Sequence, residues 1–391
     1  MDIFAKFNTD QVDEAIRAGL YPYFHTLQSR QDVEVIMEGK RRIMLGSNNY
    51  LGLTVHPRVV EAARQALQKY GSGCSGSRFL NGTLDLHVQL EEELAAFTGK
   101  EAAVIFSTGF QSNLGIISAI AGRGDYIVCD RENHASIYDA CKLSYAKMTR
   151  FSHNDMADLE KTLQSIPPTA GILIVTDGVF SMSGDICDLP AIVALGKKYG
   201  ARIMVDDAHG LGVIGEGGRG SASHFGLTED VDIIMGTFSK SLASLGGFMS
   251  CSSKLAHYVR HASRPFIFSA SITPASAASA LEALRILKET PQLPQRLLQL
   301  SAYMRQALKQ RGVNIHESAT PIIPIYTYEQ YPTQIINKRL YEEGLYVNMV
   351  LPPATAPGEC LIRTSYMASH TEALLDEAAD IIKKVFSEHG L

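Results

Sequence analysis

Two residues at successive strand ends, Asp206 and Lys240, carry the chemistry that this sequence could perform. Each follows a short apolar run, at residues 202–205 for the acid and 232–235 for the lysine. Apolar runs that stop at polar residues are typical of buried parallel strands that deliver side chains into a cleft at their carboxyl ends. An enzyme that uses pyridoxal 5'-phosphate (PLP) requires such a pair. The lysine amine forms a Schiff base with the cofactor, and the carboxylate keeps its pyridine nitrogen protonated.

Either residue alone would be weak evidence for a site. A lysine after a strand is usually a solvated surface residue, and an aspartate there can cap the following helix. The interpretation depends on the two occurring together, and on His209, which stands three residues after Asp206 in Val-Asp-Asp-Ala-His-Gly. This spacing lets Asp206 reach the cofactor's ring nitrogen while His209 approaches its phenolic oxygen.

A phosphate-binding turn is expected where the apolar run at residues 102–106 leads into a helix through Ser-Thr-Gly-Phe. Backbone N–H groups at such a turn, assisted by the helix dipole, bind a phosphate. Hydroxyl groups just before Lys240 could add donors to the same phosphate. A simple strand-to-helix turn is the alternative. The expected contacts are Ser107, Gly109, Phe110, Thr237 and Ser239.

Three further residues at strand ends are candidates for contacts with cofactor or substrate. His134, in Glu-Asn-His-Ala-Ser, could stack its ring on a planar cofactor, although it could also be a helix-start histidine without a function. Ser181 lies in a polar loop at another strand end, within reach of the cofactor. Arg363 ends a short apolar run and could clamp a substrate carboxylate bidentately. A surface arginine is the alternative for Arg363.

The stretch richest in glycine, residues 71–83, is not a dinucleotide site. It follows a helix and not a strand, and no βαβ unit surrounds it. We expect a flexible loop that lines a site or a subunit interface, with Ser77 among its hydroxyl groups.

Alternation of apolar runs with helical patterns from about residue 100 to 250 predicts an α/β domain with a mainly parallel sheet. After about residue 284 the pattern changes to long helices and a few strands, which indicates a smaller C-terminal α+β domain. With 391 residues, the chain exceeds what one core normally serves. We therefore expect an N-terminal segment at 1–45, a large PLP-binding domain at 46–283 and a small domain at 284–391.

The composition of the chain argues against several classes of protein. The net charge of −5 argues against a non-specific nucleic-acid binder, which would need a basic excess. We expect no secretion signal and no spanning helix, because charges interrupt the first ten residues and every apolar stretch is short. The six cysteines lack CxxC spacing, which indicates reduced thiols of a cytoplasmic protein and no metal site. They are Cys74, Cys129, Cys141, Cys187, Cys251 and Cys360.

Together, these segments resemble the α-oxoamine synthases, a family of fold type I (aspartate aminotransferase-like) PLP enzymes. The resemblance runs in order from Gly-Ser-Asn-Asn-Tyr-Leu-Gly at 46–52, through residues 71–83 and the motifs above, to Arg363. It implies the following roles. Lys240, Asp206 and His134 would be the catalytic lysine, the partner of the pyridine nitrogen and the stacking ring, with His209 and Ser181 near the phenolic oxygen. Asn49 and Arg363 would hold the amino acid, with Ser77 nearby.

The resemblance also implies a homodimer with active sites at the subunit interface. In it, the segment Phe268-Ser-Ala-Ser271 would reach the neighbouring subunit's cofactor phosphate. Members of this family condense an amino acid with an acyl-CoA, releasing CoA and usually carbon dioxide.

Within the family, Gly-Leu-Tyr-Pro-Tyr-Phe at 19–24, residues 71–83 and Phe-Ser-His-Asn-Asp at 151–155 are most similar to the bacterial branch that joins L-serine to palmitoyl-CoA. Ser183 stands where many relatives carry an acid, which also favours this branch. The alternatives are the branches that join glycine to acetyl-CoA or alanine to a pimeloyl thioester. A plain transaminase and a non-catalytic partner subunit are further alternatives, although a non-catalytic subunit should have lost Lys240. Contact with a membrane surface is a further possibility for an enzyme with a lipid product.

Overall fold

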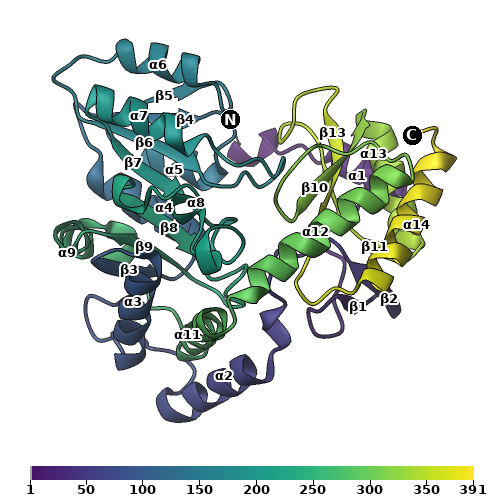
Figure 1. Cartoon of the computed structure of the whole chain (residues 1–391), viewed down its shortest axis with the longest axis horizontal. Coiled ribbons are helices and arrows are strands. Elements are labelled where there is room, and N and C mark those ends of the chain that lie inside the picture. The colour runs from purple at the N-terminus through teal and green to yellow at the C-terminus, as the bar shows by residue number, and fades with distance from the viewer. Residues whose placement is uncertain (1) are drawn as a thin grey trace.

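A seven-stranded sheet forms the centre of the large domain (Figure 1). The computed structural model describes residues 2–391. The strand order is β3-β9-β8-β7-β6-β4-β5, and only β9 runs antiparallel to its neighbours. The strands are β3 (Ala102–Phe106), β4 (Tyr126–Asp130), β5 (Lys147–Phe151), β6 (Ile172–Asp177), β7 (Arg202–Asp206), β8 (Ile233–Thr237) and β9 (Gly247–Cys251).

Helices cover both faces of this sheet because successive strand residues point to opposite sides. In β6, Ile174 packs in the core beneath α6 (Met156–Gln164) and α7 (Leu189–Tyr199), whereas Val175 packs against the other face. That other face is covered by α4 (Gly109–Ile120), α5 (Ala135–Leu143) and α9 (Ser253–Ala262). A third core lies between the β3–β9–β8 side of the sheet and the helices α3 (Asp85–Thr98) and α11 (Pro274–Glu289).

The mainly parallel α/β sheet agrees with the expectation, but two of its strands were not predicted from the sequence. β5 reads Lys-Met-Thr-Arg-Phe and lies at the sheet edge, so only Phe151 of its residues is fully buried. β9 reads Gly-Phe-Met-Ser-Cys and returns directly from the Lys240 turn. Neither has the continuous apolar run that identifies a central parallel strand.

The small domain contains two three-stranded sheets and the helices α12 (Gln292–Gln310), α13 (Gln330–Glu342) and α14 (Glu372–Glu388). Helix α12 runs from the large domain along the small one (Figure 1). One sheet is antiparallel and joins β10 (Ile322–Tyr328), β13 (Cys360–Ser365) and β12 (Asn348–Val350). The other joins β1 (Glu34–Met37), β2 (Lys40–Met44) and β11 (Leu345–Tyr346).

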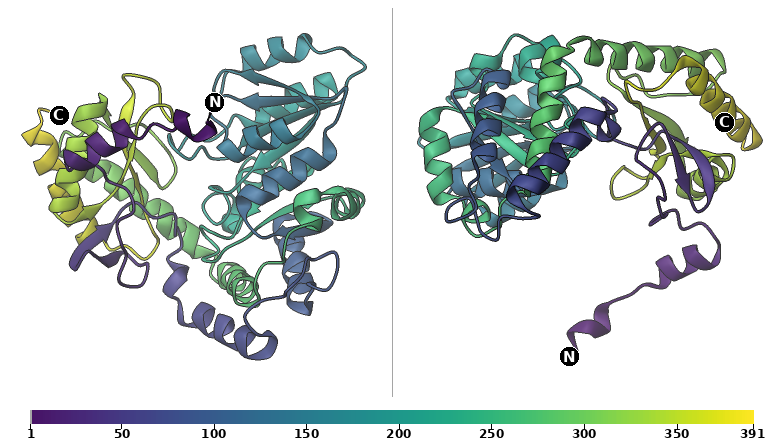
Figure 2. Two further views of the ribbon diagram at one scale, coloured as in Figure 1. Left: turned by 180° about the vertical axis from the view of Figure 1, so that it is seen from behind. Right: turned by 90° about the horizontal axis from the view of Figure 1, so that it is seen from below.

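Residues that precede the large domain contribute to the small one. Ile43 and Leu45 are buried in the same core as α12, α13 and α14. Before them, the short helices η1 (Ile3–Lys6) and α1 (Asp10–Arg17) extend away from the body of the molecule (Figure 2). Among residues 2–391, no helix combines the length and apolar character needed to cross a bilayer.

Candidate active site

The carboxyl ends of the parallel strands bring the expected side chains to one edge of the sheet. Asp177 ends β6 and Asp206 ends β7, and the two are direct partners in the strand register. Lys240 lies in the turn between β8 and β9, and His134 follows β4 at the start of α5. Residues far apart in the chain therefore meet here, as expected at the edge of a doubly wound sheet.

Asp206 is buried and fixed by hydrogen bonds. Asn113 Nδ2 donates to its Oδ2 at 2.7 Å, and the backbone N–H of Ala208 donates to its Oδ1 at 3.1 Å. The same Asn113 amide donates to Ser136 Oγ at 2.8 Å. Asn113 lies in the turn-and-helix segment that the sequence indicated, but its contact with Asp206 depends on the packing of α4 beside β7.

His134 is tied to the same network. Its Nδ1 lies 2.7 Å from Ser136 Oγ and accepts from the Ser136 N–H at 3.3 Å, so the ring caps α5. Because Nδ1 acts as an acceptor, the neutral ring carries its proton on Nε2. Phe110 packs edge-on to the ring, with centroids 6.2 Å apart. The structure thus brings His134 and Phe110 together, as the sequence motifs indicated.

Two other aspartates surround Asp206 and differ from it in environment. Burial, together with the charge of Asp206, raises the pKa of Asp177 well above its usual range. Asp207 turns away and accepts from the Ser221 N–H at 2.7 Å and from its hydroxyl at 2.5 Å. Burial raises the pKa of Asp207 to about 6. Asp206 differs from both in being held by the Asn113 amide and the Ala208 N–H.

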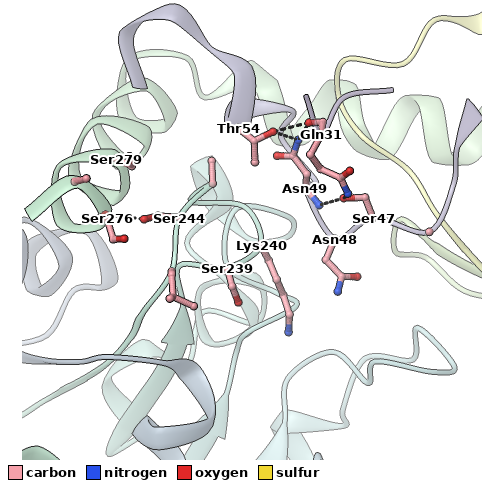
Figure 3. A pocket seen from close by; sticks show the side chains of 14 residues that line it. Gln31, Ser47, Asn48, Asn49, Thr54, Ser239, Lys240, Ser244, Ser276 and Ser279 are labelled. Atoms are coloured by element: carbon pink, nitrogen blue, oxygen red, sulfur yellow. Dashed lines mark hydrogen bonds between the residues drawn. The ribbon is translucent and has the colours of Figure 1, made fainter. Parts of the chain in front are cut away.

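Burial lowers the pKa of Lys240 to about 8, against the opposing charges of Asp206 and Asp177 and with the help of Arg363. About a tenth of this lysine is consequently a neutral amine at pH 7, which is the form that acts as nucleophile or base. Its side chain extends into a cleft of about 620 Å³ that is also lined by Asn48, Asn49, Ser244 and Ser276 (Figure 3).

His209 is buried against Tyr50, a residue to which the sequence motifs assigned no role. The hydroxyl of Tyr50 lies 2.7 Å from His209 Nδ1. Burial, with the nearby cations Lys240 and Arg363, holds the pKa of His209 well below its usual range. The ring is therefore neutral.

Arg363 reaches this group from β13 of the small domain. Its Nε donates to the carbonyl of Ser181 at 2.5 Å, and its Nη2 donates to Asn48 Oδ1 at 3.1 Å and to the Tyr50 hydroxyl at 3.5 Å. Within residues 2–391, Nη1 makes no hydrogen bond and remains for a ligand. Arg363 is buried, so it is not a surface arginine.

Asn49 is not brought to Arg363. Its Nδ2 donates to Thr54 Oγ1 at 2.8 Å, whereas its Oδ1 is buried without a partner in the described chain. Figure 3 shows Asn49 turned toward Thr54 and Gln31, while Asn48 extends to the same side of the cleft as Lys240. Asn48 is thus a further site residue. The run Asn-Asn-Tyr was visible in the sequence, but which amide faces the arginine depends on the backbone there.

The expected phosphate contacts gather at the start of α4. An added Cβ on Gly109 would lie 2.7 Å from Thr237 Oγ1, so the helix terminus and the end of β8 are in close contact. Thr237 Oγ1 lies 2.9 Å from Ser239 Oγ. The first turn of α4 leaves N–H groups without intrahelical partners. Ser107 lies at this turn, and its hydroxyl donates to the carbonyl of Ala270 at 2.6 Å.

The two remaining predicted contacts lie beside this turn. Ser271 Oγ donates to the carbonyls of Gly82 at 2.7 Å and Gly76 at 3.1 Å, so it is bound to the glycine-rich loop of its own chain. Ser77, in that loop, has a buried hydroxyl without a partner in the described residues. Neither residue contacts Lys240 or Arg363.

The residues present fit PLP. A helix terminus with adjacent hydroxyls suits its phosphate, the held carboxylate of Asp206 suits its pyridinium nitrogen, and Lys240 suits its aldehyde. Among residues 2–391, no group of histidine, cysteine, aspartate and glutamate could hold a metal ion.

Comparison with known proteins agrees with this geometry. The family model for aminotransferase class I and II matches residues 40–382. The serine palmitoyltransferase of Sphingobacterium spiritivorum is 52% identical over 96% of this chain and 94% of its own length. The 8-amino-7-oxononanoate synthase of Geobacter sulfurreducens is 44% identical over 95% of this chain and 96% of its own. A solved structure of SPT with PLP internal aldimine superimposes with a TM-score of 0.96 at 37% identity, covering 100% of both chains. The expected fold class and family resemblance are confirmed.

Proposed function

The chain belongs to the aminotransferase class I and II family, and from this membership we propose that it is a PLP-dependent serine palmitoyltransferase. It condenses L-serine with palmitoyl-CoA to give 3-ketodihydrosphingosine, CoA and carbon dioxide, the first step of sphingolipid synthesis. The observation that carries the proposal is the full-length similarity to a named serine palmitoyltransferase. The placement of Lys240 supports it, because the charges of Asp206 and Arg363 both act on its amine.

When bound, PLP supplies an electron sink for the negative charge that develops at the amino acid Cα. The protein supplies binding and proton transfer. Asp206, held by Asn113, places a negative charge where it stabilises a protonated ring nitrogen. Lys240, with its pKa lowered to about 8, takes the Cα proton as a neutral amine.

Arg363 binds the carboxylate of the amino acid through the guanidinium edge that its protein partners leave free. The neutral His134 ring presents an Nε2–H donor to the acyl thioester carbonyl, since its Nδ1 is occupied by Ser136. The neutral His209 ring is held by the hydroxyl of Tyr50, which also accepts a hydrogen bond from Arg363.

The second candidate is condensation of L-alanine with a pimeloyl thioester, favoured by the 44% identity to an 8-amino-7-oxononanoate synthase. An absorbance titration of the PLP-loaded protein with L-serine, L-alanine and glycine separates the candidates. Palmitoyl-CoA, a pimeloyl thioester or acetyl-CoA is then added and thiol release is followed. Saturable serine binding with thiol release only from palmitoyl-CoA supports the proposal. Release with alanine and the pimeloyl thioester, or with glycine and acetyl-CoA, would overturn the substrate assignment.

The proposal includes a homodimer. Support comes from large apolar side chains that are exposed on the two adjoining segments expected at the interface, with Phe268 at 75% and Leu80 at 76%. Exposed apolar side chains that gather in one place are typical of a protein interface. The segment of residues 268–271 would then reach the cofactor phosphate of the neighbouring subunit, and the glycine-rich loop would line the interface. Sedimentation equilibrium measures the mass; a monomer with full activity would contradict this part.

We also place the enzyme in the cytoplasm with peripheral membrane contact. The reason is chemical, because a soluble CoA thioester enters and a long-chain lipid, which partitions into bilayers, leaves. Cell fractionation followed by a high-salt wash tests both statements. Complete retention in the membrane fraction after the wash would contradict a peripheral attachment.

A further inference from the structure

The loop between β6 and α7, residues 178–188, lies between the two domains and is held from both sides. Within it, the N–H of Gly184 donates to the carbonyl of Phe180 at 2.9 Å, and the N–H of Phe180 donates to the carbonyl of Asp185 at 2.9 Å. These bonds close a tight turn, so that Ser181 and Asp185 are held at fixed positions relative to one another.

Side chains of the small domain form hydrogen bonds with three residues of this turn. Arg363 Nε donates to the carbonyl of Ser181 at 2.5 Å. The hydroxyls of Ser318 and Thr320 both donate to the carbonyl of Gly184 at 3.0 Å. His316 Nε2 lies 2.9 Å from Asp185 Oδ1. The arginine at the substrate cleft and the histidine outside it therefore hold opposite ends of one turn.

The segment of His316 pairs with the sheet that carries Arg363. The N–H of His316 donates to the carbonyl of Pro324 in β10 at 2.9 Å, and Pro324 is the register partner of Arg363 in β13. A shift of His316 relative to the large domain is thus accompanied by a shift of the Arg363 backbone, because backbone pairing joins the three segments.

The electrostatics strengthen the outer contact. Although burial opposes it, hydrogen bonds from His153 and His316 hold the pKa of Asp185 below its usual range. The hydrogen bond to Asp185 raises the pKa of His316. The second ring nitrogen of His316, Nδ1, lies 2.8 Å from the hydroxyl of Tyr326. The contact between Asp185 and His316 therefore favours the charged form of both groups, and both ring nitrogens have hydrogen-bond partners.

We propose that Asp185 and His316 are positioning residues that hold Arg363 in place for the amino-acid carboxylate and so set the affinity for the amino acid. The inference rests on the proposed function, because it takes Arg363 as the carboxylate ligand. The pair lies across the interdomain turn and does not itself contact Lys240. Its loss therefore weakens amino-acid binding selectively, whereas a pair that only stabilised the fold would affect both substrates or neither.

The test compares His316→Gln and Asp185→Asn with the control Glu317→Gln, which changes an exposed neighbour of His316 that pairs with Lys309. In the PLP-loaded proteins, absorbance titration gives the Kd for L-serine, and thiol release gives the KM for palmitoyl-CoA. We expect the Kd for serine to rise about tenfold in both variants, the loss of one charged hydrogen bond. The KM for palmitoyl-CoA should stay within about twofold, the scatter typical of surface substitutions. The control should match the wild type.

Hydrogen exchange in the PLP-free proteins supplies a second readout. Amides of residues 178–188 and 360–365 should exchange faster in His316→Gln than in Glu317→Gln, because the turn and β13 are released together. Unchanged serine affinity, equal loss for both substrates, or unchanged exchange in these segments would each overturn the inference. A wild-type protein that does not bind serine would instead count against the proposed substrate, and the exchange comparison would still decide the positioning role.

Discussion

His134, which follows β4, and Asp206, which ends β7, are joined through the side chains of Asn113 and Ser136. Asn113 Nδ2 lies 2.7 Å from Asp206 Oδ2 and 2.8 Å from Ser136 Oγ, and Ser136 in turn lies 2.7 Å from His134 Nδ1. The Asn113 amide on α4 thus orients the Asp206 carboxylate directly and the His134 ring through Ser136.

Asn113→Ala should therefore weaken PLP binding. The variant leaves the buried Asp206 carboxylate with only the Ala208 N–H, a loss of about 1–3 kcal/mol for a buried charged acceptor. We expect the Kd for PLP to rise about tenfold or more, measured by absorbance after equilibrium dialysis. Ser118→Ala is the control, because Ser118 lies on the same helix and bonds only to the carbonyl of Leu114. Equal affinity in Asn113→Ala and the control would contradict the role of the amide.

Lys240→Ala should remove the covalent link to PLP and abolish turnover. No other described lysine lines the cleft around residue 240. Borohydride reduction followed by peptide mass spectrometry should show the cofactor on Lys240 in the wild type and on no peptide of the variant. A borohydride-sensitive absorbance that persists in Lys240→Ala would refute the assignment.

The pKa of Lys240 also predicts a pH dependence. Because burial lowers this pKa to about 8, the neutral amine is the minor form below pH 8 and the major form above it. The rate at which the PLP-free protein takes up PLP should consequently rise with pH and level off above about pH 9. Stopped-flow absorbance between pH 6.5 and 10 measures the rate. A midpoint near the ordinary lysine value of about 10.4 would show that burial does not act on this amine.

Arg363→Ala should weaken L-serine binding more than palmitoyl-CoA binding, because the guanidinium is assigned to the amino-acid carboxylate. We expect serine affinity to fall roughly 10-fold to 100-fold. This loss corresponds to about 1.5–3 kcal/mol, the range for a charged hydrogen bond. Arg363→Lys should recover only part of it, because an ammonium cannot keep the bonds to Ser181 and Asn48 and also bind a carboxylate. Equal losses for both substrates would remove the carboxylate role.

Gly109→Ala tests the phosphate position. The new methyl group would lie 2.7 Å from Thr237 Oγ1 and force α4 away from the end of β8. PLP should bind at least about tenfold more weakly, since one strong hydrogen bond to the phosphate would be lost or lengthened. Gly122→Ala is the matched control because the nearest atom to its Cβ is 4.0 Å away. If the phosphate binds elsewhere, Gly109→Ala and Gly122→Ala should have the same affinity for PLP, which would contradict this position.

Local pattern in the sequence identified the strand ends and the residue types that stand on them. The apolar runs before Asp206 and Lys240 predicted buried parallel strands, and parallel strands present their carboxyl ends at one edge whatever the loops between them do. The helix after the Ser107 turn was predicted equally well, because the apolar residues that identify it are close together in the sequence. Strands and helices of this kind depend on residues that are close in the sequence, and a sequence pattern contains that information.

Tertiary structure decided which of several similar side chains meet. Asn49 was expected to hold the amino acid together with Arg363, yet it is Asn48 that contacts Arg363, because successive side chains along the backbone point in different directions. Tyr50, Asn113 and the pair of Asp185 with His316 join segments that lie more than 90 residues apart. Their contacts depend on how domains and layers pack, and such long-range packing leaves no local periodicity in the sequence from which it could be read.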